Sequence, residues 1–230
     1  NMKPANYSAA IADYQKYVAA KPGDAAAWKD LSVAAYNSAG NPPKAGAAID
    51  TALNAAEKAI SLDPSAVEPL LIKAESLSIQ NKPKEAIDAY SKYLAKKPDD
   101  PNAFDGRGRA YFNTQQWAQA VSDFDKVLAK TPNDTDVKRL RALALAKAPG
   151  GGTAALASLK EVAESSPTDP TAWSQYGIAL YKAEKYDDAG KAFSKVVDLQ
   201  PKGSPGRLDA LRNLCAAADK KAEQSKSEAD

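Results

Sequence analysis

The sequence predicts an all-α fold, a solenoid of stacked antiparallel helix pairs, and two periodic patterns support it. Prolines recur 34, 34, 35 and 34 residues apart, at Pro64, Pro98, Pro132, Pro167 and Pro201. A small side chain follows ten residues after a proline, at Ser32, Ala74, Gly108, Ala142 and Gly177. A period in this range is typical of repeated helix pairs, and the small residues allow two crossing helices to approach closely.

The composition excludes several classes of protein. The 230 residues contain no histidine, which removes Ser-His-Asp and Cys-His catalytic sites and His-ligated zinc. Cys215 is the single cysteine, so neither an intrachain disulfide nor a CxxC metal site can form. The net charge of +2 is too balanced for a typical nucleic-acid binder. We therefore expect no enzyme, no cofactor, no metal site and no nucleic-acid partner. No apolar run reaches the roughly 20 residues of a membrane helix, so we expect no membrane insertion in this segment.

The elements follow in order along one predicted domain, residues 1–223. Residues 4–22 carry only the pattern of a second helix, so we interpret them as the second helix of a truncated repeat or as a cap. Full repeats are predicted at 25–66, 67–100, 101–134, 135–169 and 170–203, then a capping helix at 204–223 and a disordered tail at 224–230. Asn1 precedes Met2, which is not a natural translation start, so an upstream signal peptide, anchor or further repeats stay open.

The first full repeat carries an insertion. The interval from Pro22 to Pro64 is 42 residues, eight more than the common period, and the extra residues fall around 41–48. Apolar residues from Ile49 to Ile60 keep a helical spacing, so we predict an extended second helix that protrudes past its neighbours. A tolerated insertion at a loop tip is the alternative.

Helix starts are marked by capping residues. Asp100-Pro101, Asp169-Pro170 and Ser204-Pro205 each offer an N-cap side chain followed by proline at the first helical position. Ser65 with Glu68 fits a capping box.

One stretch resembles the tetratricopeptide repeat (TPR) family almost position for position: Trp173, Gly177, Leu180, Tyr186, Ala189, Phe193 and Pro201. The resemblance extends over about five full repeats, with a half repeat before them and a capping helix after them. It implies a right-handed α-α superhelix and a non-catalytic scaffold that binds a peptide or protein segment in a concave groove. Armadillo-type repeats are the structural alternative, although their period is roughly 40–47 residues.

The resemblance also implies which residues face that groove. Carried over by repeat position, the candidates are Lys29, Tyr36, Leu71, Ile72, Glu75, Arg109, Phe112, Arg139, Leu143, Gln175, Ile178, Tyr181 and Arg212. Any of them could instead line the packing between repeats. A chaperone-tail clamp would need asparagine where Val33 stands, so we disfavour that TPR subclass.

A charged ladder occupies the position where the TPR consensus prefers leucine: Lys73, Arg107 and Arg141. It could bind an anionic ligand. Alternatively, the long stems pack and the heads pair with acids such as Asp123.

Self-assembly is the alternative function, through the protruding helix near 41–53 or through the open N-terminal edge. The partner's identity, the pathway and the oligomeric state stay open. An excess of lysine over arginine and a single cysteine fit a bacterial extracytoplasmic or membrane-tethered domain, with a cytoplasmic location as the alternative.

Overall fold

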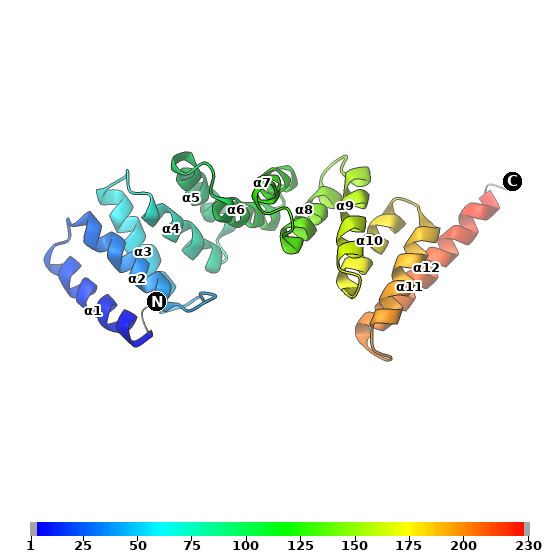
Figure 1. Cartoon of the computed structure of the whole chain (residues 1–230), viewed down its shortest axis with the longest axis horizontal. Helices are drawn as coiled ribbons and strands as arrows, with labels where there is room; N and C mark the ends of the chain where they lie inside the picture. The colour runs from blue at the N-terminus through cyan, green and yellow to red at the C-terminus, as the bar shows by residue number, and fades with distance from the viewer. Residues whose placement is uncertain (1–3, 228–230) are drawn as a thin grey trace. The chain divides into compact units, whose positions relative to one another are not determined.

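The computed structural model describes residues 4–227, which form twelve α-helices (Figure 1). They are α1 (Pro4–Ala20), α2 (Ala25–Ser38), α3 (Ala47–Leu62), α4 (Glu68–Ile79), α5 (Pro83–Lys96), α6 (Pro101–Asn113), α7 (Trp117–Lys130), α8 (Thr135–Lys147), α9 (Gly152–Ser165), α10 (Pro170–Lys182), α11 (Tyr186–Leu199) and α12 (Pro205–Ser227). Each predicted full repeat contains two of these helices. We call α2, α4, α6, α8 and α10 the first helices, and α3, α5, α7, α9 and α11 the second helices.

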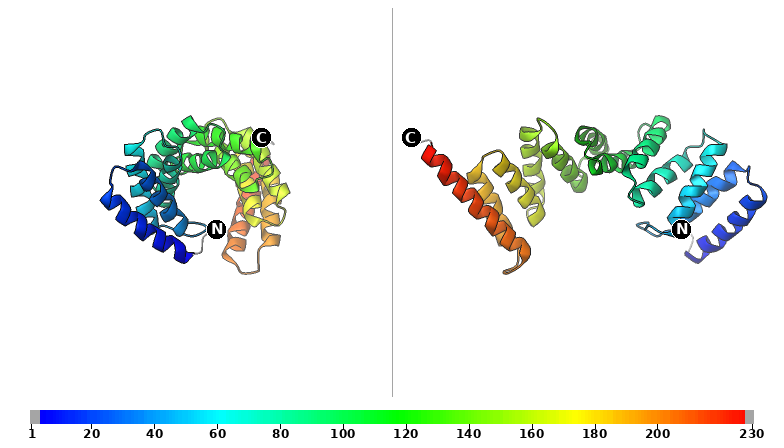
Figure 2. Two further views of the ribbon diagram at one scale, coloured as in Figure 1. Left: turned by 60° about the vertical axis from the view of Figure 1, so that its left-hand side comes forward. Right: turned by 180° about the vertical axis from the view of Figure 1, so that it is seen from behind.

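The chain packs as two compact units, with the boundary between Val127 and Leu128 inside α7. In unit 1, each of the helices α1 to α5 packs on its successor in the chain. In unit 2, each of the helices α8 to α11 packs on its successor (Figure 2). Both units are thus solenoids of helix pairs, and the prediction of one domain over 1–223 stays a prediction. None of the helices within residues 4–227 is both long and apolar enough to cross a bilayer.

Aspartate side chains start most of the first helices. Asp100 Oδ1 accepts hydrogen bonds from the backbone N–H groups of Asn102 and Ala103, and Asp169 accepts one from Thr171. Asp24 and Asp134 cap α2 and α8 in the same way. These carboxylates satisfy N–H groups that have no partner inside the helix, so the two predicted Asp-Pro starts are confirmed.

The predicted capping box at Ser65 is wrong. Helix α4 begins at Glu68 with Val67 in the N-cap position and no side-chain cap. Ser65 instead donates its backbone N–H and its hydroxyl to Asp63 Oδ1, at 2.9 and 2.6 Å. The Asp63 turn holds Ser65 away from the helix start, and Pro69 stabilises the first turn of α4 by fixing its φ angle.

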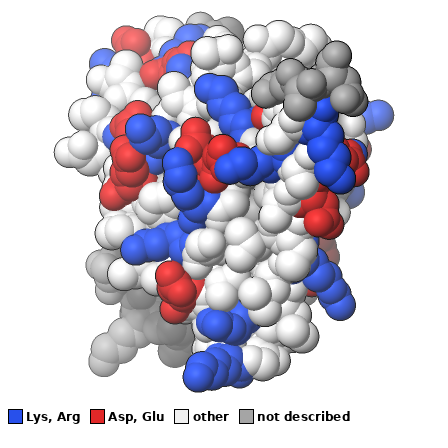
Figure 3. Space-filling model, turned by 90° about the vertical axis from the view of Figure 1, so that its right-hand side faces the viewer, with Lys and Arg blue, Asp and Glu red and all other residues white. Residues whose placement is uncertain are grey.

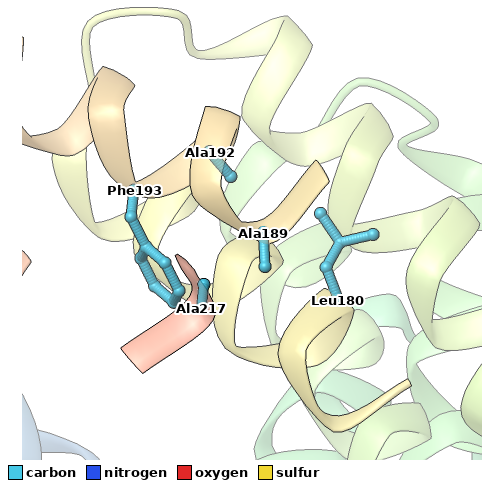
Figure 4. Close-up of a cluster of buried hydrophobic side chains, with 5 residues drawn as sticks. All are labelled: Leu180, Ala189, Ala192, Phe193 and Ala217. Carbon is cyan, nitrogen blue, oxygen red and sulfur yellow. The ribbon is translucent and has the colours of Figure 1, made fainter. Parts of the chain in front are cut away.

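Small residues in the first helices allow large ones of the second helices to pack closely. A Cβ atom added to Gly108 would lie 2.8 Å from the Phe124 ring, and one added to Gly177 would lie 2.8 Å from the Phe193 ring. Figure 4 shows Phe193 and Ala189 of α11 beside Leu180 of α10 and Ala217 of α12, all buried. The recurring small column therefore sets the distance between the helices of a pair.

The insertion in the first repeat is a loop, so the predicted helical extension is wrong. Helix α3 has 16 residues against 14 in every other second helix, and it begins only at Ala47. Residues 39–46 lie outside helices. Two glycines with positive φ, Gly40 and Gly46, enclose Pro42 and Pro43. Proline and glycine disfavour helix interiors, and they stop the helical pattern of α3 from continuing backwards.

The C-terminal helix runs further than predicted. Helix α12 extends to Ser227, so residues 224–227 of the predicted disordered tail are helical, and the other tail residues, 228–230, lie outside the described part. No glycine or proline follows Gly206, and the last turns are rich in Ala, Lys, Glu and Gln, which favour helices.

Candidate functional site

All thirteen candidate residues lie on the first helices or on α12. Seven belong to unit 1, namely Lys29, Tyr36, Leu71, Ile72, Glu75, Arg109 and Phe112, and six to unit 2, namely Arg139, Leu143, Gln175, Ile178, Tyr181 and Arg212. They include both half-exposed and buried side chains. Ile72 is only 7% exposed and packs with Ala35, Ala52 and Ala56, so it lines inter-helix packing rather than a surface open to a ligand.

The charged candidates interact with acids close in sequence. Arg109 Nε donates to both oxygens of Asp105 at 2.9 Å. Arg139 and Arg212 pair with carboxylates three residues earlier on the same helix, Asp136 at 2.6 Å and Asp209 at 2.9 Å. Lys29 lies 3.2 Å from Asp30 and 3.9 Å from Glu68. Acidic and basic side chains also alternate over the face drawn in Figure 3, in keeping with the small net charge.

Two aromatic pairs recur where a first helix turns into a second helix. Phe112 of α6 meets Trp117 of α7 edge to face, with ring centroids 5.2 Å apart. Tyr181 of α10 meets Tyr186 of α11 in the same way, at 5.3 Å. In both pairs the first ring belongs to the twelfth residue of its helix and the second ring to the first residue of the next helix. These two contacts, called the aromatic pairs below, fill the same place in two repeats.

We call the exposed sides of the first helices the first-helix surface. In unit 1, the partly buried carboxylate of Glu75 lies on this surface, on α4. Burial raises the pKa of Glu75 above its usual value, the neighbouring Asp100 raises it further, and interaction with the Tyr36 hydroxyl opposes these effects. The pKa of Tyr36 is raised by burial and by the negative charge of Glu75. Unit 1 therefore holds an acidic side chain whose ionised form its surroundings disfavour.

The charged ladder is a set of structural contacts between helices. Arg107 makes a two-pronged ion pair with Asp123, Nε to Oδ2 at 2.7 Å and Nη2 to Oδ1 at 2.9 Å, and its Nη1 donates to Ser91 Oγ at 3.0 Å. The paired carboxylate raises the pKa of Arg107 further. Lys73 pairs with Glu57 at 2.8 Å, and Arg141 donates to Ser158 Oγ at 3.3 Å. The predicted pairing with Asp123 is confirmed.

Unit 2 contains a pocket of about 300 Å³ between α8, α9 and α10, called the α8–α10 pocket below. It is lined by Leu143, Ala146, Lys147, Gly152, Ala155, Leu159, Gln175, Ile178, Ala179, Lys182 and Ala183. The predicted residues Leu143, Gln175 and Ile178 meet here, and Ile178 is 42% exposed. The side-chain oxygen Oε1 of Gln175 is buried with no hydrogen-bond partner.

Sequence reasoning missed most of this lining. Ala146 is the twelfth residue of α8 and Gly152 is the first residue of α9, so they occupy the two places that hold the aromatic pairs in neighbouring repeats. The sequence did contain a signal for the pocket, because both of these aligned positions carry small residues. Assigning groove residues by repeat position selects side chains that can contact a ligand, so it does not detect positions where a small residue leaves a pocket.

Unit 1 contains an equivalent but smaller pocket, about 190 Å³ between α4, α5 and α6, called the α4–α6 pocket below. It is lined by Ser78, Asn81, Pro83, Tyr90, Gly106, Arg109, Ala110 and Asn113. Its lining is mainly polar. Tyr90 is 4% exposed, and a Cβ atom at Gly106 would lie 2.3 Å from the Tyr90 hydroxyl oxygen, so the tyrosine ring occupies the space that this glycine leaves.

The described residues offer little for metal or nucleophilic chemistry. Within residues 4–227, no group of three or more His, Cys, Asp or Glu side chains could hold a metal ion. Cys215 is a free, exposed thiol on α12.

Comparisons with known proteins identify the repeat. Models of the tetratricopeptide repeat match residues 5–53, 49–101, 77–144 and 150–204. No curated protein matches the chain significantly.

Solved structures with this fold include the crystal structure of YrrB, described as a TPR protein with an unusual peptide-binding site. It is 22% identical, with a TM-score of 0.71, over 86% of this chain and 97% of YrrB. A crystal structure of MamA is 19% identical, with a TM-score of 0.65, over 75% of this chain and 91% of MamA. MamA from Desulfovibrio magneticus RS-1 is 22% identical, with a TM-score of 0.55, over 69% and 96% of the two chains.

The fold is thus that of a protein-interaction scaffold, of a kind that is typically non-catalytic. With matching models over well over half of its residues, the chain belongs to the tetratricopeptide repeat family.

Proposed function

We propose that this chain is a non-catalytic scaffold that binds a segment of a protein or peptide on the first-helix surface of unit 2. The observation that carries the proposal is the α8–α10 pocket, which brings together three of the groove residues predicted from the family resemblance. A mostly apolar hollow with few polar groups is the usual form of a binding site. The similar fold of YrrB, described as having an unusual peptide-binding site, supports a peptide as the ligand.

The contacts of the remaining candidates support unit 2 rather than unit 1. The basic candidates of both units already pair with acids of this chain, so the apolar candidates decide between the units. In unit 1, Ile72 is buried. In unit 2, Ile178 is an exposed aliphatic side chain at the mouth of an apolar pocket. Burial of apolar surface is the main favourable contribution to binding, so the segment gains most where Ile178 and Leu143 lie.

Photo-crosslinking in an extract of the source cell tests this proposal. A benzophenone amino acid replaces Ile178 in one variant and Lys195, an exposed residue of α11, in a matched control. We expect a covalent product with a second protein from position 178 and not from position 195. The same products from both positions, or none from position 178, would contradict the proposal.

Self-association is a second candidate, favoured by one observation in unit 1. A hollow of about 530 Å³ lies between α1 and α2, lined by Ala10, Asp13, Tyr14, Tyr17, Asp24, Ala26, Ala27 and Asp30. Tyr17 is 41% exposed there, an aromatic surface that a second copy could cover. A protein mass that rises with concentration in sedimentation, and that falls back to the monomer in Tyr17→Ser, is the expected result. A monomeric mass throughout the micromolar range would exclude this candidate.

A further inference from the structure

The α8–α10 pocket is space that aromatic rings occupy elsewhere in the chain. Ala146 and Gly152 stand at the two places where the repeats on either side carry the aromatic pairs, and both residues line the pocket. The helices that surround it are otherwise of the same length and order. A ring of a ligand can therefore lie where the missing pair would lie, against Leu143 and Leu159.

The polar groups of the pocket restrict the ligand further. Lys182 is an exposed lysine in the lining, and no carboxylate is among the described residues that line the pocket. The positive charge favours acidic residues beside the inserted ring. Gln175 Oε1 is buried without a hydrogen-bond partner, and an unsatisfied buried acceptor is unfavourable. A ligand that brings an O–H or N–H donor satisfies this acceptor once the Gln175 side chain turns toward the pocket.

A second hollow shares two lining residues with the pocket and favours an extended segment over a small molecule. Ile178 and Lys182 line both the α8–α10 pocket and a hollow of about 390 Å³ between α10, α11 and α12. The second hollow is also lined by Tyr181, Phe193, Asn213 and Ala216. A chain that places one side chain in the pocket can thus continue across Ile178 toward α12.

We propose that the α8–α10 pocket binds a tyrosine or tryptophan side chain of a partner protein, within a segment in which acidic residues flank this aromatic residue. The ring fills the place of the missing aromatic pair, and its O–H or N–H donates to Gln175 Oε1 once the Gln175 side chain turns toward the pocket. The flanking carboxylates lie near Lys182. This inference rests on the proposed function and names the chemical class of its ligand.

Selection from a random peptide library on the full chain tests the inference. We expect the enriched peptides to contain tyrosine or tryptophan beside aspartate or glutamate. The best of them, labelled with a fluorophore, then serves as the probe for anisotropy measurements with each variant. Its affinity should fall as salt is added, because the flanking charges are screened.

The decisive variant restores the ring pair of the neighbouring repeats. A146F/G152W places in unit 2 the same two residue types as the pair of Phe112 and Trp117, and an added Cβ at Gly152 meets nothing within 4 Å, so we expect the variant to fold. It should weaken binding of the probe about tenfold or more, the loss expected when a buried side chain is excluded. Ala157→Phe adds a ring at an exposed position of α9 outside the lining and should leave binding unchanged. Circular dichroism checks the helix content of both.

A charge variant tests the flanking residues separately. Lys182→Glu should shift a repeated selection from acidic toward basic residues beside the ring. Enriched peptides without an aromatic residue, unchanged binding in A146F/G152W, or unchanged flanks in Lys182→Glu would each overturn the inference, as would the failure of any peptide to be enriched. Peptides that lack an aromatic residue but crosslink at position 178 would overturn it while leaving the proposed function intact.

Discussion

The α4–α6 and α8–α10 pockets occupy equivalent places in two repeats, yet their contents differ. In unit 1, Tyr90 of α5 extends into the pocket, and Gly106 of α6 has no side chain that would block this ring. In unit 2 the second helix supplies the shorter Leu159, and the first helix supplies Gln175. With the ring of Tyr90 in its lining, the unit 1 pocket has a volume of about 190 Å³, against about 300 Å³ for the unit 2 pocket.

The same difference extends to the charged groups. Unit 1 binds its cations to its own carboxylates, Arg109 to Asp105 and Arg107 to Asp123. At the equivalent positions of unit 2 stand Ile178 instead of Arg109 and Ser158 instead of Asp123. At these two positions unit 1 carries paired charges and unit 2 carries uncharged side chains, although Arg139 and Arg212 of unit 2 also pair with acids of this chain.

The largest effect should come from breaking the ion pair of unit 1. Asp123 is 2% exposed, and Asp123→Ala leaves the Arg107 guanidinium largely buried without its carboxylate, which costs about 3–5 kcal/mol. The matched change in unit 2, Ser158→Ala, removes one neutral acceptor from Arg141 and should cost about 1 kcal/mol or less. Urea unfolding followed by circular dichroism measures both. Equal losses of unfolding free energy in the two variants would show that Arg107 and Arg141 contribute equally to stability.

The next largest effect on stability should come from alanine substitutions of Gly106 in the α4–α6 pocket and Gly152 in the α8–α10 pocket. A methyl group at Gly106 meets the Tyr90 hydroxyl at 2.3 Å and the ring at 2.4 Å, and the buried ring has little freedom to move, so Gly106→Ala should destabilise by about 1–3 kcal/mol. Gly152→Ala meets nothing within 4 Å and should be neutral or stabilising by about 0.4–1 kcal/mol. Thermal unfolding of the two variants compares them. A stable Gly106→Ala would show that Tyr90 does not fill its pocket rigidly.

The fold was predictable because it depends on periodic columns that one sequence displays. Gly108 and Gly177 stand in the small column, and they contact Phe124 and Phe193 as that column requires. The helical extension before Ala47 failed because the eight extra residues of this repeat were assigned to the second helix, although the prolines and glycines among residues 40–46 disfavour a helix there. Local backbone chemistry outweighed periodicity at that point.

The binding surface was only partly predictable. Leu143, Gln175 and Ile178 do meet at one pocket, but Arg109, Arg139 and Arg212 pair with acids three or four residues earlier, a spacing that is visible in the sequence. Part of the space comes from Ala146 and Gly152 and part from the short side chain of Leu159, and these contributions appear only when the repeats are compared with one another. Repeat position identifies the residues that face a surface, and the packing of their neighbours decides which remain available.

The smallest effect should be a pH-dependent one, at Glu75 of unit 1. Burial raises the pKa of this carboxyl above its ordinary value near 4.5, so the folded protein holds the proton more tightly than the unfolded chain does. The stabilisation linked to this proton is complete below the unfolded pKa and is lost as the pH rises through the folded pKa. Glu75→Gln carries no such proton, so its stability relative to the wild type should increase as the pH rises.

Thermal unfolding of wild type and Glu75→Gln from acidic to neutral pH measures this difference, which should stay within about 1 kcal/mol. Glu164→Gln, at an exposed carboxylate of unit 2, controls for the loss of one negative charge. A difference that shrinks as the pH rises, or the same trend in Glu164→Gln, would show that burial does not disfavour the Glu75 carboxylate. A difference that grows as the pH rises, and that is absent in Glu164→Gln, would show that Glu75 is a partly desolvated acid. Such an acid would be one more polar group that distinguishes the first-helix surface of unit 1 from the apolar pocket of unit 2.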